Sequence, residues 1–180
     1  MNLYTADSHL GHFNVIKHDG RPFSSLEEMN ETLIKNHNNR VSNSDDVYLG
    51  GDLFFREKNP ERYLKRLNGK LHLAVGNHDK YWLKNHELRK YFVEINDIIH
   101  IEEGSDTIIM CHYPMAEWDG YYRGTWHIYA HIHNNLNEAF EIMKNKEKAL
   151  NAGCMINGYM PVTFEELKIN NKLFKESVGA

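Results

Sequence analysis

The sequence has few cysteines, no long apolar run and no excess of basic side chains, and each absence excludes a class of protein. Its two cysteines, Cys111 and Cys154, lack zinc-finger spacing, so we expect reduced, buried thiols rather than a disulfide framework. The apolar runs are far too short to span a bilayer. With 21 basic and 25 acidic side chains the net charge is −4, which does not predict strong non-specific binding of nucleic acid.

Several common sequence signals are also missing. The chain has no G-x-x-x-x-G-K-S/T loop and no G-x-G-x-x-G fingerprint, so it does not resemble the usual nucleotide-binding folds. Its first residues enter a strand pattern at once, without the layout of a signal peptide, and we expect a cytoplasmic protein without membrane association. No linker or repeat interrupts the 180 residues, which are 41% hydrophobic, so we expect one globular domain over residues 1–180.

Short apolar runs rich in β-formers alternate with helical patterns along the chain. Ser24 and Glu27 have the spacing of a capping box, which predicts a helix that runs to about Arg40. Strands early in the chain alternate with helices, and later ones form a hairpin, which indicates two mixed sheets packed together with helices outside. We expect strands at 2–6, 46–49, 71–75, 92–103, 106–111, 126–130 and 148–151, helices at 60–67, 81–84, 87–90 and 164–169, and a loop or helix at 137–144.

Histidine is abundant, with 12 in the chain, and several histidines stand with other polar residues just after apolar runs. Ligands and catalytic groups collect beyond the carboxyl ends of strands. Carboxylate, imidazole and carboxamide groups suit divalent transition metals. One pair alone could simply hydrogen-bond the backbone, but the full set predicts a metal site. The residues are Asp7 and His9, then Asp52, then Asn77, His78 and Asp79, then His112, and finally His131 and His133.

In this order the motifs resemble those of the calcineurin-like metallophosphoesterase superfamily, whose signature runs D-x-H, G-D, G-N-H-D/E, H and G-H-x-H. The resemblance covers residues 1 to about 135 and is closer to the small prokaryotic and phage phosphoesterases, whose early segment is similar to residues 7–14 and 21–23. It implies an α/β fold, an α/β/β/α sandwich of two mixed β-sheets flanked by helices. Ala130 departs from the family's glycine, and the segment after Asp52 lacks the pattern of phosphoprotein phosphatases.

The resemblance also implies two divalent metal ions. A shared carboxylate would lower the repulsion between two such ions, which suits Asp52 as the bridge. Manganese is our first expectation, with iron, nickel, cobalt or zinc as alternatives, because these ligands do not discriminate among them. By resemblance one ion would be held by Asp7, His9, Asp52 and His133, and the other by Asp52, Asn77, His112 and His131.

Five further residues have expected roles around the metal ions. His78 is the expected general acid, and Asp79 would either orient its imidazole or cap a short helix. His12 would contact the substrate or stabilise its loop. Arg21 would bind substrate phosphate or pair with an acid. Arg56 would also bind substrate phosphate, or else lie on the surface.

The predicted function is hydrolysis of phosphodiester bonds through a metal-bridging hydroxide, with nucleotides or nucleic-acid ends as candidate substrates. A phosphomonoesterase of small molecules is the close alternative, and a non-catalytic metal-binding scaffold is a third. Aromatic residues crowd segment 113–126, where a base-stacking wall, a packed loop and a homodimer contact all remain open.

Overall fold

The computed structural model describes residues 1–179. The first of its two sheets contains four parallel strands. Their order is β1 (Asn2–Thr5), β2 (Asp46–Leu49), β3 (Lys70–Ala74) and β4 (Phe92–Asn96). The expectation of two mixed sheets is therefore wrong for this one, because each connection within it crosses over through helical segments and returns the next strand in the same direction. The crossovers contain α1 (Phe13–His18) and α2 (Leu26–Arg40), then α3 (Glu61–Leu64), and finally α4 (Asp79–Trp82) with η1 (His86–Tyr91).

The second sheet is mixed, in the order β5 (Ile98–Glu103), β6 (Asp106–Cys111), β7 (Trp126–Tyr129) and β8 (Ala149–Asn151). β5 and β6 form the expected antiparallel hairpin, and the remaining pairs are parallel. The strand predicted over 92–103 is in fact two strands in different sheets. Residues 96–98 are all exposed, and there the chain passes from one sheet to the other.

Two long helices show how local sequence sets helix ends. α2 (Leu26–Arg40) begins one residue later than predicted, because the Ser25 hydroxyl accepts from the Glu28 N–H while Ser24 donates to the Glu28 carboxylate. α6 (Phe164–Ser177) has a complete Thr163 capping box and is longer than expected. The short helices are α1 (Phe13–His18), α3 (Glu61–Leu64), α4 (Asp79–Trp82), α5 (Glu138–Met143), η1 (His86–Tyr91), η2 (Tyr121–Arg123) and η3 (Cys154–Ile156).

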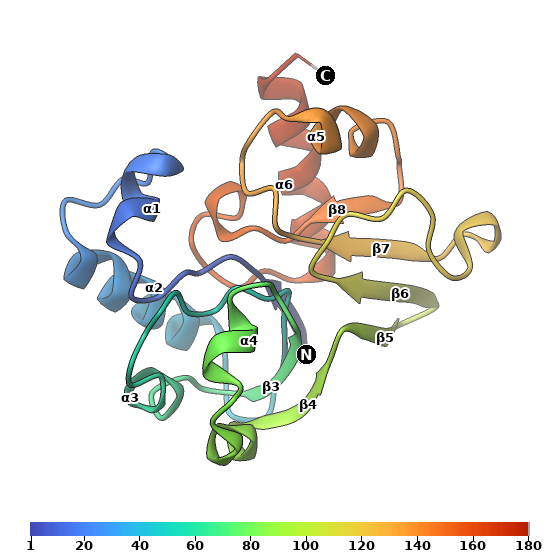
Figure 1. The fold of residues 1–180 in the computed structure, drawn as a ribbon. Coiled ribbons are helices and arrows are strands. Elements are labelled where there is room, and N and C mark those ends of the chain that lie inside the picture. Colours follow the sequence, from blue (N-terminus) through green and yellow to red (C-terminus); the bar gives the residue numbers. More distant parts are fainter. Residues whose placement is uncertain (180) are drawn as a thin grey trace.

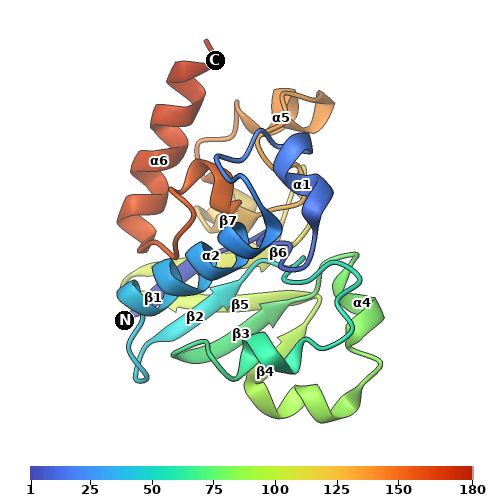
Figure 2. The same cartoon turned by 90° about the vertical axis from the view of Figure 1, so that its left-hand side faces the viewer.

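Alternating side chains divide the apolar core into layers. Along β1, Leu3 packs toward α2 and Tyr4 packs between the sheets, and along β6, Met110 lies between the sheets while Ile109 packs toward α5. In Figures 1 and 2, α2, α3 and α4 cover the first sheet, α5 lies over the second, and α6 runs beside β1 and β8. This arrangement confirms the predicted α/β sandwich of two sheets flanked by helices.

None of the helices within residues 1–179 combines the length and the apolar character of a membrane span.

Candidate metal centre

The segments that follow β1, β2, β3, β6 and β7 meet beyond the carboxyl ends of these strands. The turn after β1 continues to pair with the segment after β2, since the N–H groups of Asp7 and His9 donate to the carbonyls of Gly51 and Asp52, each at 3.0 Å. The turn after β7 joins them, because the His131 N–H donates to the Asp7 carboxylate at 3.1 Å. All seven predicted ligands therefore lie in one cluster, although their binding of metal stays a prediction.

The first part of the cluster contains Asp7, His9 and His133, whose ligand atoms lie within 4.8 Å of one another. The Nε2 atoms of His9 and His133 are 3.0 Å apart, and His133 Nε2 is 3.9 Å from Asp7 Oδ1. Zinc-like ions hold imidazole nitrogens at about 2.0–2.1 Å, so two nitrogens on one ion lie roughly 3 Å apart. This group has the donor types and the spacing that such an ion requires.

The second part contains Asp52, Asn77, His112 and His131. His112 Nδ1 donates to the Gly50 carbonyl at 2.8 Å, so in the neutral ring Nε2 carries a lone pair. This nitrogen faces the amide oxygen of Asn77 at 3.1 Å and Asp52 Oδ2 at 3.6 Å. Three acceptors thus converge where a cation would satisfy them all, so these residues fit a metal ion.

Asp52 lies between the two parts. Its Oδ2 atom is 3.6 Å from His9 Nε2 and 3.6 Å from His112 Nε2, one imidazole in each part. Its other oxygen accepts from the His78 N–H at 2.9 Å, which fixes the orientation of the carboxylate. A carboxylate in this position can be shared by two ions.

The backbone of the cluster is strained. Only seven non-glycine residues within 1–179 have positive φ, a conformation that costs about 1–3 kcal/mol each. Five of the seven are predicted metal ligands: Asp7 (54°), His9 (50°), Asp52 (52°), His131 (70°) and His133 (54°). Strain of this kind persists only where surrounding contacts hold it, and it is concentrated at this site.

Two glycines allow the close approach of these segments. Gly76 packs so tightly that a Cβ there would lie 2.3 Å from Asp52 Oδ1. At Gly51, where φ is 92°, a Cβ would lie 2.7 Å from His112 Nδ1. Any larger residue would push Asp52 or His112 away from its present position.

Burial controls the charge states of the cluster. It raises the pKa of the Asp7 carboxyl to about 7 and also raises that of Asp52. It lowers the pKa of the imidazoles of His9, His112 and His131, which keeps their rings neutral. A neutral imidazole is the form that binds metal, and a nearby cation would in turn favour the ionised carboxylates.

Asp79 does not hold the His78 imidazole, so its predicted orienting role is wrong. Its carboxyl is fully buried, and it lies in the first turn of α4, with His78 rather than Asp79 at the N-cap. Among the residues described, its partners at 2.8–3.0 Å are the N–H groups of Asp52, Leu53 and Gly76 and the indole of Trp82. Asp79 therefore ties the segment after β2 to the segment after β3 and supports Asp52 from behind.

His78 lies on the open side of the cluster. Its side chain is 37% exposed, and its Nε2 atom is 3.9 Å from Asp52 Oδ2. The edge of its ring packs against Phe55, with ring centres 4.8 Å apart. His78 also forms a possible ligand group with His9 and Asp52, so the geometry suits either a proton donor or an additional ligand. Its catalytic role stays a prediction.

Arg21 is placed where it cannot bind substrate, which corrects that prediction. Its side chain is 0% exposed, and its guanidinium forms an ion pair with Asp19 at 2.8 Å. The other oxygen of Asp19 accepts from His133 Nδ1 at 2.8 Å. Burial lowers the pKa of His133, but this hydrogen bond and the charges of Asp7 and Asp19 outweigh burial and raise it. Sequence reasoning missed Asp19, which belongs to no recognised motif.

His12 and Arg56 lie at the rim around Phe55. The His12 ring stacks on Phe55, with centres 3.7 Å apart, and burial lowers its pKa to about 4. The Arg56 side chain is exposed, and its guanidinium carbon lies 5.3 Å from the centre of the Phe55 ring. Both lie beside Phe55, whose ring packs against His78, and their contact with substrate stays a prediction.

The aromatic loop after β6 is packed onto the protein. Trp118 is buried and donates from its indole to the carbonyl of Thr125 at 2.9 Å. His127 on β7 accepts from the Met115 N–H at 3.1 Å, which anchors the start of the loop. Tyr113 is 42% exposed, and its ring centre is 4.7 Å from that of His131, so this residue lines the open side of the cluster.

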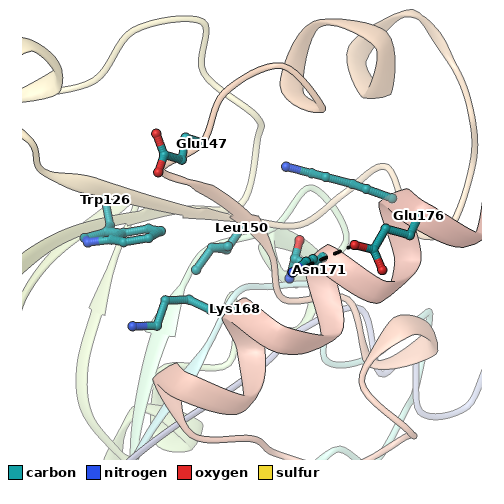
Figure 3. Close-up of a pocket in the computed structure, with 8 residues that line it drawn as sticks. Trp126, Glu147, Leu150, Lys168, Asn171 and Glu176 are labelled. Atoms are coloured by element: carbon teal, nitrogen blue, oxygen red, sulfur yellow. Dashed lines mark ion pairs between the residues drawn. The ribbon is translucent and has the colours of Figure 1, made fainter. Parts of the chain in front are cut away.

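A separate cavity of about 390 Å³ lies between β7 and α6, as Figure 3 shows. Its wall includes Trp126, at the start of β7, whereas His131 and His133 follow the end of that strand. The Asn171 side chain in the wall is already bonded to the backbone of Asn151. This cavity is not part of the candidate metal centre.

Comparison with known proteins identifies an archaeal relative of this chain. No family model matches the chain. It is 34% identical over 163 residues to the uncharacterized protein MJ1445 of Methanocaldococcus jannaschii, which covers 89% of this chain and 85% of that protein. The chain belongs to the family of this archaeal protein. The archaeal name states no activity, so the function must be inferred from the chemistry of the site.

Two solved structures resemble the fold. The protein of unknown function AQ665 from Aquifex aeolicus matches with a TM-score of 0.74 and 25% identity, over 94% of this chain and 98% of that one. A predicted phosphoesterase from Streptococcus pneumoniae matches with a TM-score of only 0.41 and 15% identity, over 84% and 70% of the two chains. The second likeness is too distant to support an argument.

Proposed function

We propose that this protein is a metal-dependent phosphoesterase of the calcineurin-like metallophosphoesterase superfamily. The observation that supports it most is the convergence of Asp52, Asn77 and the His112 lone pair, with acceptor–acceptor distances of 3.1 and 3.6 Å. Buried acceptors that face one another are costly unless a cation lies among them. The order of the motifs along the chain supports the assignment to this superfamily.

The proposed centre holds two divalent ions. One ion would be held by Asp7, His9 and His133, and the other by Asn77, His112 and His131. Asp52 would bind both ions. The position of Asp52 Oδ2, at 3.6 Å from an imidazole of each part, supports the bridging role. Manganese is our first choice, and iron, nickel, cobalt and zinc suit the same nitrogen and oxygen donors.

Bound ions of this kind would supply Lewis acidity, which activates water and neutralises the charge of a phosphate ester. The chain's own residues supply the rest. Asp7 and His112 are fully buried at the base of the cluster, where they exclude bulk water and strengthen electrostatic interactions. His78 lies on the open side, where a proton can be passed to the leaving oxygen of a bound ester.

Phosphodiesters are the proposed substrate class, with nucleotides or nucleic-acid ends as the first candidates. The exposed part of Tyr113 lies beside His131, and Phe55 lies beside His78, so aromatic surfaces flank the open side. Such surfaces can stack against a base. Small phosphomonoesters are the alternative substrates. A scaffold without activity is disfavoured because every expected ligand position holds a suitable residue.

The test is a turnover screen on metal-loaded protein. The purified chain is stripped with a chelator and reloaded in parallel with manganese, iron, nickel, cobalt or zinc. Bound metal is counted by elemental analysis, and bis-(4-nitrophenyl) phosphate, 4-nitrophenyl phosphate and cyclic nucleotides are offered. Turnover with bound metal supports the proposal. A preparation that holds two ions per chain and hydrolyses none of these esters refutes it.

Substitution of His78 separates an enzyme from a scaffold. His78→Ala should lower kcat by about 10²–10⁴-fold, the usual contribution of a general acid, while the bound metal stays near two ions per chain. The control is His100→Ala, which removes an exposed histidine on β5. Equal turnover in the two variants would exclude His78 as the acid, and loss of metal from His78→Ala would make it a ligand instead.

A further inference from the structure

Asp19 and Arg21 form a buried ion pair beside the candidate metal centre. Asp19 directly follows α1, and the two side chains are 3% and 0% exposed. The Arg21 Nε and Nη2 atoms donate to the same carboxylate oxygen of Asp19 at 3.0 and 2.8 Å. A buried pair of this kind contributes little net stability compared with apolar residues of the same size. Both side chains also bind the segments that carry the predicted ligands.

Arg21 holds the first ligand turn. Its Nη2 atom donates to the carbonyl of Asp7 at 2.8 Å and its Nη1 atom to the carbonyl of Ser8 at 2.9 Å. Asp7 and His9, which flank Ser8, both have positive φ. The planar guanidinium therefore fixes two successive carbonyls of a strained turn, which a lysine, with a single ammonium, cannot match.

Asp19 holds the second ligand turn. Its free oxygen accepts from His133 Nδ1 at 2.8 Å. Because a carboxylate offers no proton, Nδ1 must carry one, and the Nε2 atom of His133 is turned toward His9 and Asp7. The Asn134 side chain also donates to the carbonyl of Asp19, at 3.2 Å, which keeps this turn against the loop after α1.

We propose that Asp19 and Arg21 are positioning residues of the metal centre, which join the ligand turn after β1 to the ligand turn after β7 and set the nitrogen that His133 presents to the ion. The two turns follow strands of different sheets, so this ion pair fixes the ligands after β1 relative to the ligand after β7. The inference rests on the metal-binding part of the proposed function and does not depend on the reaction. Partners of this kind typically contribute 10–100-fold to metal affinity.

The test compares Asp19→Asn with Glu94→Gln. Glu94 accepts from His72 Nδ1 at 2.7 Å, so the control removes the charge from a similar carboxylate–histidine bond away from the centre. Manganese affinity is measured by calorimetry on chelator-stripped protein, with folding checked by circular dichroism. We expect affinity to fall 10–100-fold in Asp19→Asn and to stay within about twofold in Glu94→Gln. Equal affinities in Asp19→Asn and the native chain would overturn the inference.

A measurement on the native chain covers the case in which Asp19→Asn fails to fold. In zinc-loaded protein, nitrogen-15 NMR of the His133 ring should show Nε2 bound to the ion and a slowly exchanging proton on Nδ1. A metal-bound Nδ1, or an Nδ1 proton that exchanges freely with water, would overturn the inference. Neither assay measures turnover. A chain that binds ions and hydrolyses nothing refutes the phosphoesterase and leaves the positioning role intact.

Discussion

Lowering the pH should unfold this protein partly through one residue, His127. Its ring is 0% exposed on β7. Nδ1 donates to the carbonyl of Ile109 at 2.9 Å, and Nε2 accepts from the Met115 N–H at 3.1 Å, so both ring nitrogens are used by the neutral form. Burial lowers the pKa of His127 from 6.5 to about 4. A proton added to Nε2 would face the Met115 N–H directly.

The sign follows from proton linkage. Between pH 6.5 and 4 the unfolded chain takes up a proton at this position and the folded chain does not, so stability falls as the pH falls. With pKa values of 6.5 and about 4, the loss is about 1 kcal/mol at pH 5.5 and about 2–3 kcal/mol at pH 4.5. Below pH 4 it levels off at about 3 kcal/mol, because both states are then protonated.

Urea unfolding of the chelator-treated protein at several pH values between 7.5 and 4.5 measures this loss. Other groups also titrate, so the informative quantity is the difference between the native chain and His127→Gln. Glutamine is not protonated, and the difference should shrink by about 2–3 kcal/mol over this range. His100→Gln, at an exposed position, controls for loss of an ordinary histidine. A difference that stays constant with pH would refute the reasoning.

Three more outcomes are expected. Asp79→Ala leaves three buried N–H groups and the Trp82 indole without their acceptor, so the free energy of unfolding should fall by at least about 3 kcal/mol in urea titrations. Gly51→Ala, at φ 92° and with its Cβ 2.7 Å from His112 Nδ1, should lower both the melting temperature and the bound metal counted by elemental analysis. Manganese at about 100 times its Kd should stabilise the chelator-treated protein by about 2.7 kcal/mol, which would raise its melting temperature. An unchanged melting temperature would contradict a metal centre.

The predictions that succeeded depend on local patterns. Short apolar runs mark strands because the alternation of side chains is set within a few residues, and the start of α6 at Phe164 was predicted from an equally local pattern. The predicted ligands could be assigned to one site because each follows a strand, and the carboxyl ends of these strands meet on the same side of the sandwich. The Ser24 cap failed because serine occupies both positions 24 and 25, and only the backbone geometry decides which of them caps α2.

The failures concern residues whose burial depends on tertiary packing. Arg21 and Asp79 are charged residues near recognisable motifs, and their residue types suit catalysis as well as support. The structure places both in the interior, where their charges are used to hold other segments. No pattern in the sequence separates a catalytic role from a supporting role for these residues, because their burial depends on how the loops pack.

By itself the sequence determined the α/β class, the positions of most strands along the chain and the donor types that follow them, because periodicity and residue chemistry are local properties. Only the tertiary structure decided that β4 and β5 belong to different sheets and that Asp19 meets His133, 114 residues away in the sequence. Such contacts form when separate segments pack against one another, and their geometry depends on every segment between them.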